Sequence, residues 1–429
     1  MSRVKNLWIM VLLVALIGYF AFLEIQFFHK PILRDFFHFY EASKALVSHQ
    51  YLYSSGIGGY VYPPFFAFLM IPLTHFSLET AKIIWKFLNY LFLFFSLYLS
   101  FKLVARLFRL QYNKWQVTGV CCLTVLLCLN QVANELKFNQ TDILILFGIT
   151  LSLYYFDSKP LFSGIILGII ANIKYITFFF LPLLIFRARW RVVIGLLIGL
   201  IIGLILPAVI IGWKTNLHYL MIAFRGLKNM PGERAPLLVT QFEAKVPGVM
   251  WTHNISITNG LLRIMVDQGY LASYALFISI NIAVVIFLIL WRIFYKQSIP
   301  FIWRPLTLKN GFYENAVIYL ELTALLVILL AFSPQCTLRH LLLVVNLQLL
   351  AVVMLIFPVQ QVKRWPALTG ILIYQLGTLF NRVFLVPFHM DWNYFGGPAW
   401  ALVLALPFII YNGLTYCQAL YSIKFEKIN

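Results

Sequence analysis

The segment 33–46, "LRDFFHFYEASKAL", places an Arg–Asp pair in an otherwise apolar and aromatic stretch, just after a first hydrophobic run that ends near Phe28. A carboxylate at the point where a chain leaves the membrane can act as a general base, because a hydroxyl substrate needs a proton acceptor within hydrogen-bond reach. Asp35 could instead cap a helix or pair with Arg34 at the surface. The other polar residues of the chain must decide between these roles.

Several basic residues could bind an anion near such a base. Lys174 lies in the middle of the apolar run 164–186, where a lysine costs about 2.5–3.5 kcal/mol unless it snorkels or pairs. It is therefore either a snorkelling side chain at a span end or a cation for a phosphate group. Arg263 and Arg339 are further candidates for the phosphate. His340 is either a capping histidine at the interface or a hydrogen-bonding partner of phosphate or sugar.

Neutral polar residues and further acids complete the candidate set. Gln140 and Asn254 could bind sugar hydroxyls, or could satisfy backbone groups at helix ends. Asp142 could be a second acid, although a lone Asp at the start of a span is more often an N-cap. Asp35, Glu41 and Asp142 do not have the spacing of metal ligands, so neither a metal nor another cofactor is predicted.

The composition indicates a polytopic membrane protein. Of the 429 residues, 62% are hydrophobic and 11% are charged, whereas soluble domains are about a quarter charged. The net charge of +19 fits cationic cytoplasmic loops that meet anionic lipid. Nucleic acid is not expected as a partner, because the cations form no single basic face. The five cysteines lack C-x-x-C or Cys/His spacing, which argues against a disulfide framework or a zinc site.

The hydrophobic runs predict an all-α bundle of about 12 transmembrane helices in one domain, residues 1–429. The positive-inside rule places both termini in the cytoplasm and two long loops, 29–80 and 213–269, outside. Glu233 and Glu243 in the second loop have no assigned role. The run 161–186 is either one span or two short helices with Lys174 at the outer turn, and the second alternative keeps "RARWR" inside. The other spans are expected at 7–28, 81–105, 117–134, 142–157, 191–212, 270–291, 316–333, 341–357, 366–381 and 398–420.

The first loop is expected to contain external juxtamembrane helices. On a helix over 33–46, Asp35, His38 and Phe39 share one face with Ala42, a pattern that fits an amphipathic helix lying on the membrane surface. A Gly-rich turn and the Pro63–Pro64 pair follow it.

The order of several short motifs resembles glycosyltransferase family 87, the polyprenyl-phosphate-mannose-dependent mannosyltransferases of the GT-C superfamily. The resemblance covers about residues 35–345. Asn139 and Asp142 stand where the family pattern has Gly and Asn, and "QCTLR" replaces the usual aromatic-containing spacer before the histidine. The motifs are Asp35-Phe36, Phe39-Tyr40-Glu41-Ala42, Leu52-Tyr53, Tyr62-Pro63-Pro64, Pro72-Leu73, Asn139-Gln140-Thr141-Asp142, Ser163-Gly164…Gly168…Lys174, Asn254-Ile255-Ser256…Arg263 and Ser333-Pro334…His340.

The resemblance implies a GT-C-like fold and inverting transfer of a sugar, by default mannose, from a polyprenyl-phosphate donor to a hydroxyl of a lipid or glycan acceptor. It also implies a bacterial inner membrane, with the active site on the periplasmic or external face. Asp35 would then be the catalytic base. Residues expected to bind substrate are Lys174, Arg263, His340, Gln140, Asn254, Arg339 and Tyr62.

Two other classes of function remain open at this stage. A transporter or lipid flippase would need paired ionisable residues inside its spans and symmetry between halves, and no internal repeat is evident in the sequence. A non-catalytic scaffold would make the external polar residues incidental.

Overall fold

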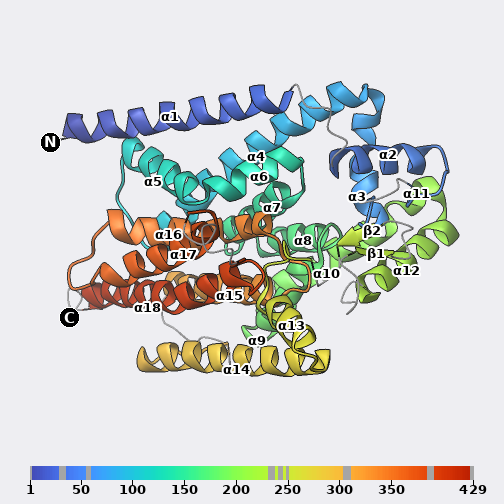
Figure 1. Ribbon diagram of the computed structural model, residues 1–429. Coiled ribbons are helices and arrows are strands. Elements are labelled where there is room, and N and C mark those ends of the chain that lie inside the picture. The colour runs from blue at the N-terminus through green and yellow to red at the C-terminus, as the bar shows by residue number, and fades with distance from the viewer. Residues whose placement is uncertain are drawn as a thin grey trace.

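The computed structural model is almost entirely helical (Figure 1). The only strands among the described residues are β1 (Leu237–Val239) and β2 (Lys245–Pro247), which pair antiparallel. The residues that the structure describes are 2–28, 35–54, 59–229, 237–239, 245–247, 251–302, 311–383 and 391–425. Glu233 and Glu243 lie outside them.

Seven of the described helices, or helix combinations, are long and apolar enough to cross a membrane, and an eighth crossing results if α5 (Lys114–Leu127) and α6 (Leu129–Phe138), which meet at 72°, count as one. The all-helical, polytopic architecture is therefore confirmed. The seven are α1 (Ser2–Phe28), α4 (Leu78–Leu107), α10 with α11 (Trp190–Ile205 and Ala208–Ile211), α14 (Ala272–Lys296), α15 (Gly311–Phe332), η3 with α16 (Leu338–Val344 and Val345–Ile356) and α18 (Gly397–Phe425).

The expected number of about 12 spans is higher than this count. Four predicted crossings are not among the seven. Three of them correspond to segments shorter than the roughly 20 residues that span a bilayer, and the fourth to a longer helix. The short segments are α7 (Asp142–Tyr155), α8 (Pro160–Ala171), and η2 (Tyr175–Phe180) with α9 (Leu181–Phe186). The other helix is α17 (Trp365–Val383).

The run 161–186 is broken, as the two-helix alternative predicted. Helix α8 ends at Ala171, and η2 begins at Tyr175 after a short turn that contains Lys174. Pro182 is the second residue of the following α9, in the first turn, where its missing N–H is not needed. Lys174 therefore lies between two apolar helices and not within one.

Glycines allow α8 and α10 to approach until their backbones touch. A Cβ on Gly164 would lie 2.1 Å from the Val192 carbonyl oxygen, and one on Gly168 would lie 2.1 Å from that of Leu196. Small residues at such spacing are the usual means of close helix packing in membranes. The glycine motif of the sequence thus fixes the position of the turn that follows α8.

Asn172 ties this turn to both helices. Its side-chain amide donates hydrogen bonds to the carbonyl oxygens of Gly168 (2.8 Å) and Leu200 (3.1 Å). It also fills the space beside Gly203, where a Cβ would lie 2.3 Å from the amide nitrogen. These contacts hold the backbone two residues before Lys174.

The first loop folds into α2 (Asp35–Val47), α3 (Pro64–Leu69) and η1 (Ile71–His75). The apolar face of its first helix packs against protein, since Phe36 and Phe39 are 2% exposed and Tyr40 only 3%; its position at the membrane surface stays a prediction. The helix contacts α3, η1, α4 and α11. Burial on several sides fixes Asp35, the first residue of α2, against the protein.

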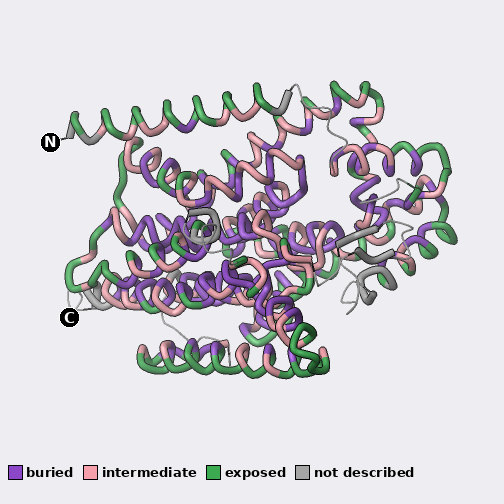
Figure 2. The backbone as a smooth tube through the Cα atoms, in the orientation of Figure 1, coloured by how far each residue is buried: buried purple, intermediate pink, exposed green. Residues whose placement is uncertain are grey.

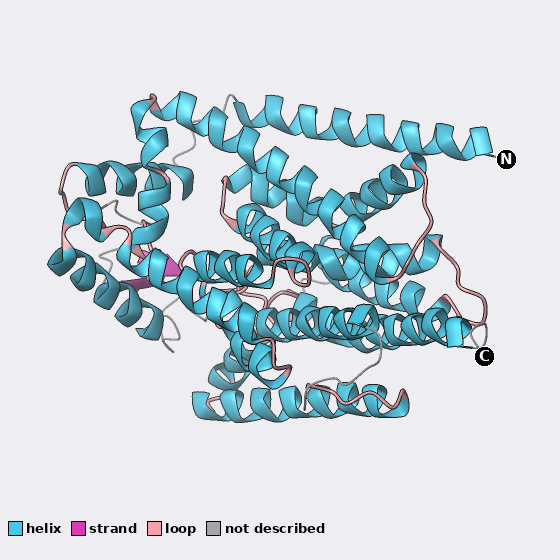
Figure 3. Ribbon diagram, turned by 180° about the vertical axis from the view of Figure 1, so that it is seen from behind, coloured by secondary structure: helices cyan, strands magenta, loops and turns pink. Residues whose placement is uncertain are grey.

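The two long loops contact each other. Helix α12 (Trp213–Asn229) of the second loop carries Tyr219, whose hydroxyl accepts a hydrogen bond from the Leu52 backbone (3.3 Å). The Tyr53 hydroxyl donates to the Tyr219 carbonyl oxygen (3.3 Å). Figures 1 and 3, seen from opposite sides, both show α2, α3 and α12 at one end of the bundle and the start of α1 and end of α18 at the other.

Burial separates central from peripheral helices (Figure 2). Of the apolar window of α1 only 6% is buried, compared with 78% for α15 and for η3 with α16. Helix α1 is nevertheless fixed to α4, because Glu24 pairs with Lys86 and accepts a hydrogen bond from the Tyr90 hydroxyl (2.9 Å).

A buried ion pair that the sequence did not reveal links α15 to the end of α9. Glu321 and Arg187 are 0% and 1% exposed, and Arg187 Nε lies 2.8 Å from Glu321 Oε2. The Ile302 backbone N–H also donates to Glu321 Oε1 (2.8 Å), and Arg187 donates to the Pro300 carbonyl oxygen (2.6 Å). Arg187 follows α9, Glu321 lies in α15, and both side chains also bond to backbone of the 300–302 segment. The ion pair therefore joins these three parts of the chain.

Candidate active site

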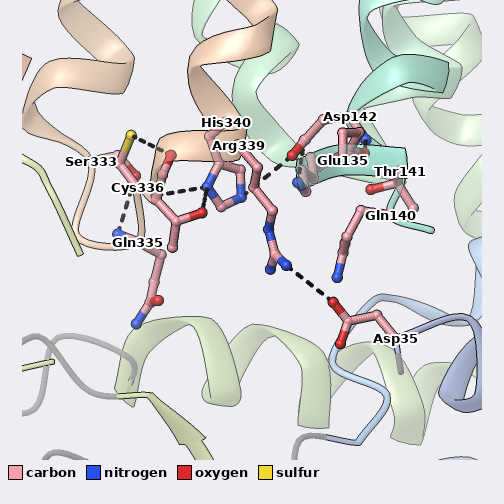
Figure 4. A network of polar contacts seen from close by, with 12 residues as sticks. Asp35, Glu135, Gln140, Thr141, Asp142, Ser333, Gln335, Cys336, Arg339 and His340 are labelled. Carbon is pink, nitrogen blue, oxygen red and sulfur yellow. Dashed lines mark hydrogen bonds and ion pairs between the residues drawn. The ribbon is translucent and has the colours of Figure 1, made fainter. Parts of the chain in front are cut away.

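Ionisable side chains from four separate segments meet beside α2, which lies at one end of the bundle (Figure 1), and Figure 4 shows most of them from close by. Two acids and three bases form ion-pair contacts there, although they lie up to 305 positions apart in the chain, from residue 35 to residue 340. They are Asp35 from α2, Asp142 from α7, Lys174 from the turn after α8, and Arg339 and His340 from η3.

Asp35 pairs with Arg339. The distance from Arg339 Nη1 to Asp35 Oδ2 is 3.2 Å, and the two side chains remain 24% and 29% exposed. Burial raises the pKa of Asp35 above its ordinary value, and the nearby charges of Arg339, His38 and Lys174 offset only part of this effect. The carboxylate is thus partly accessible, close to a cation, and a better base than a solvated aspartate.

Lys174 pairs with Asp142, whose side chain is fully buried while that of Lys174 is 20% exposed. Lys174 Nζ contacts Asp142 Oδ1, and His340 Nε2 lies 3.8 Å from Asp142 Oδ2. The buried Glu135 accepts a hydrogen bond from the Asp142 backbone N–H (2.6 Å). Lys174 is therefore held by an acid of a neighbouring helix, with part of its side chain accessible to solvent.

The local conformation around Asn139 explains how Asp142 reaches this place. Helix α6 ends at Phe138, and Asn139 adopts the left-handed conformation (φ 52°), which terminates the helix. Glycine is the default residue for this conformation and asparagine the next best, so Asn139 can replace the glycine of the family pattern without changing the turn. The Trp85 indole N–H donates to the Asn139 carbonyl oxygen (3.1 Å), and α7 begins at Asp142.

Tyr62 and Gln140 lie beside the acid of α7. The Tyr62 hydroxyl donates to Gln140 Oε1 (3.2 Å) and lies 3.3 Å from Thr141 Oγ1. Tyr62 is positioned by the Tyr-Pro-Pro segment that begins α3. Gln140 also appears in Figure 4 on the same side of the network as Asp35.

Arg263 and Asn254 have a different environment from the one expected. Arg263 is fully buried, and its guanidinium donates to the carbonyl oxygens of Tyr394 (2.8 Å), Trp251 (3.1 Å), Asn254 (3.0 Å) and Asn393 (2.9 Å). These hydrogen bonds tie the Arg263 side chain to the loops around it, and Asn254 contributes its carbonyl oxygen to them. That Arg263 and Asn254 bind substrate stays a prediction.

The loops that Arg263 holds also support the ion-pair network, although they do not belong to it. The Ile255 backbone N–H donates to the Cys336 carbonyl oxygen (2.7 Å), and the Asn259 amide donates to that of Pro334 (2.8 Å). The 333–336 segment leads directly into η3, so the Asn-x-Ser…Arg motif positions Arg339 at a distance.

Two contributors were missed from the sequence, Glu135 and Thr337, and a third, Asp142, was given a different main role. Glu135 was not singled out, although an acid between two apolar runs, seven residues before Asp142, was a visible signal. Asp142 was expected mainly to cap a helix, yet its side chain binds Lys174. Thr337, which contacts His340, has no signal of its own in the sequence. Among the described residues, no three His, Cys, Asp or Glu side chains are grouped so that they could hold a metal ion.

The family model for glycosyltransferase family 87 matches residues 60–308, more than half of the chain. The chain belongs to glycosyltransferase family 87. It is therefore a glycosyltransferase, with a sugar donor and an acceptor as substrates. The matched range contains Asp142 and Lys174, whereas Asp35 and Arg339 lie outside it. No curated protein and no solved structure gave a significant match to the chain.

Proposed function

We propose that this family 87 glycosyltransferase transfers a sugar, mannose by the resemblance, from a polyprenyl phosphate to a hydroxyl of a lipid or glycan acceptor, with inversion. The observation that carries the proposal is the meeting of Asp35 with Arg339, beside Lys174 and Asp142, at one end of a membrane bundle. A donor whose lipid tail lies in the bilayer presents its sugar phosphate at the same boundary.

In this proposal Asp35 removes the proton of the acceptor hydroxyl. The acceptor oxygen forms a bond to the anomeric carbon while the bond from that carbon to the phosphate oxygen breaks. The acceptor's proton ends on Asp35, and the electron pair of the broken bond leaves with the phosphate. A direct displacement of this kind inverts the anomeric carbon and needs no covalent intermediate, and lipid phosphate leaves readily without a strong acid.

The cations stabilise the charge that develops on the phosphate. Fixed positive groups aimed at a leaving anion contribute strongly in a site from which water is largely excluded. At rest Lys174 is bound by Asp142 and Arg339 by Asp35. Arg339 therefore exchanges Asp35 for the donor phosphate, which also releases the carboxylate to act as the base.

The distribution of cations supports an external site. Arg106 lies in the last turn of α4 and Lys296 in the last turn of α14, and both helices end away from the network. Under the positive-inside rule these ends, with both termini, face the cytoplasm. The network then faces the periplasm or the exterior of a bacterial plasma membrane.

The test is product formation by the purified protein in detergent. Incubation with radiolabelled polyprenyl-phosphate mannose and membrane glycolipid acceptors is expected to give a labelled glycolipid and an equal amount of free polyprenyl phosphate. A panel of polyprenyl-phosphate sugars identifies the sugar. Transfer from nucleotide sugars but from none of the lipid-linked donors would contradict the donor class. Movement of labelled lipid across vesicles without chemistry would favour a flippase.

A further inference from the structure

The start of η3 fixes the His340 ring in one chemical form. The Thr337 backbone N–H donates a hydrogen bond to His340 Nδ1 (2.8 Å), and the Thr337 hydroxyl oxygen lies 3.0 Å from the same nitrogen. This is the reciprocal capping arrangement of a helix N-terminus. A backbone N–H can only donate, so Nδ1 must offer its lone pair and carry no proton. The single proton of the neutral ring is therefore on Nε2.

Nε2 faces the charged part of the site. It lies 3.8 Å from Asp142 Oδ2, on the opposite side of the ring from the contact with Thr337 (Figure 4). The His340 side chain is 15% exposed. Arg339 is its neighbour in the chain, and Lys174 binds the carboxylate that it faces. A second proton on the ring would break the Thr337 bond and add a charge beside two cations.

We infer that His340 acts as a neutral hydrogen-bond donor, held in its Nε2-protonated form by the Thr337 backbone amide, and that its N–H binds an anionic oxygen of the donor phosphate. The inference rests on the proposed function for the identity of the anion. His340 keeps its proton throughout: the acceptor's proton goes to Asp35, and the phosphate leaves as an oxyanion bound by Lys174, Arg339 and the imidazole N–H. Thr337 is a positioning residue, because it acts through His340.

A substitution that keeps a donor at the same place distinguishes this role from proton transfer. In His340→Gln the side-chain amide can place an N–H near the position of Nε2, but it cannot titrate. We expect His340→Gln to retain kcat/KM within about tenfold of wild type, while His340→Ala loses about 10²- to 10³-fold, the usual cost of one donor to a developing oxyanion. The acid limb of the pH profile should coincide in wild type and His340→Gln. His75→Gln, at an exposed histidine of η1, is the matched control.

Equal loss of activity in His340→Gln and His340→Ala would overturn the donor role, as would loss of the acid limb in His340→Gln. The tautomer is tested without turnover by ¹⁵N NMR of histidine-labelled protein, with His340 assigned from the spectrum of His340→Gln. An unprotonated Nδ1 and a protonated Nε2 are expected at every pH between about 5 and 8. An imidazolium or an Nδ1-protonated ring in this range would overturn the inference, whereas failure of all sugar transfer would contradict only the proposed function.

Discussion

The resting pair of Asp35 and Arg339 predicts that removal of the carboxylate tightens the binding of a lipid phosphate. The phosphate must take Arg339 from Asp35, whose carboxylate oxygen lies 3.2 Å from the guanidinium. In Asp35→Asn the cation is no longer held, so its full attraction is available to the ligand. The same substitution removes the proposed base, so binding and turnover should change in opposite directions.

The magnitude follows from the exposure of the pair. Both side chains remain about a quarter exposed, and pairs in such contact with solvent contribute about 0.2–1 kcal/mol. Removal of Asp35 should therefore tighten the binding of polyprenyl monophosphate by about 1.4- to 5-fold. Isothermal titration calorimetry in detergent, with a short-chain polyprenyl phosphate, measures the change.

A double-mutant cycle separates the exchange of Arg339 from simple charge repulsion. Asp35→Asn in an Arg339→Met background still relieves repulsion between carboxylate and phosphate, but it has no arginine to release. The tightening should therefore be larger in the presence of Arg339. Equal tightening in both backgrounds, or weaker binding in Asp35→Asn alone, would refute the exchange.

Three further predictions follow from other parts of the structure. Activity should be lost as the pH falls through the pKa of Asp35. Because burial raises that pKa, the acid limb of the pH–activity profile should lie above 3.8, the pKa of an ordinary aspartate. An acid limb at or below pH 3.8 would contradict a buried base. Asn172→Ala should release the turn before Lys174 and raise the KM for the donor about fivefold, which corresponds to roughly 1 kcal/mol. The control Asn281→Ala, on the exposed face of α14, should leave this KM unchanged. Steady-state kinetics measures both. Glu321→Ala should lower the free energy of unfolding by about 3–5 kcal/mol, because its arginine partner stays buried without a carboxylate; an unchanged denaturant midpoint would show that the pair contributes little.

The sequence could predict the class of fold and most of the residues of the candidate site, for one physical reason. A charged side chain in an apolar chain is costly, so Lys174 was conspicuous by its position alone. The structure brings Lys174, Asp35, Arg339 and His340 into one network, although their roles in catalysis stay predictions. The break in the run 161–186 was also predictable, because a continuous span would have placed basic residues outside.

The partners of these side chains could not be predicted, because they depend on packing between distant segments. The sequence does not show, for example, that the Arg263 guanidinium donates to backbone carbonyl oxygens. The same limit hid the pairing of Asp142 with Lys174 and that of Glu321 with Arg187.

The expected number of spans exceeds the number of long apolar helices among the described residues for a related reason. Apolar runs such as α7 and α8 are long enough to suggest crossings, but these helices have only 14 and 12 residues and pack within the bundle. The helices of the first loop were predicted, but the packing of the apolar face of α2 against neighbouring helices was not.

The central claim is that the Asp35 carboxylate removes the proton of the acceptor during sugar transfer. The most direct measurement is single-turnover transfer from radiolabelled polyprenyl-phosphate mannose by Asp35→Asn, with Glu79→Gln, an exposed acid of α4, as the control. We expect Asp35→Asn to transfer at least about 10²-fold more slowly while it still binds polyprenyl phosphate, and Glu79→Gln to match wild type. Transfer by Asp35→Asn at the wild-type rate would contradict the claim.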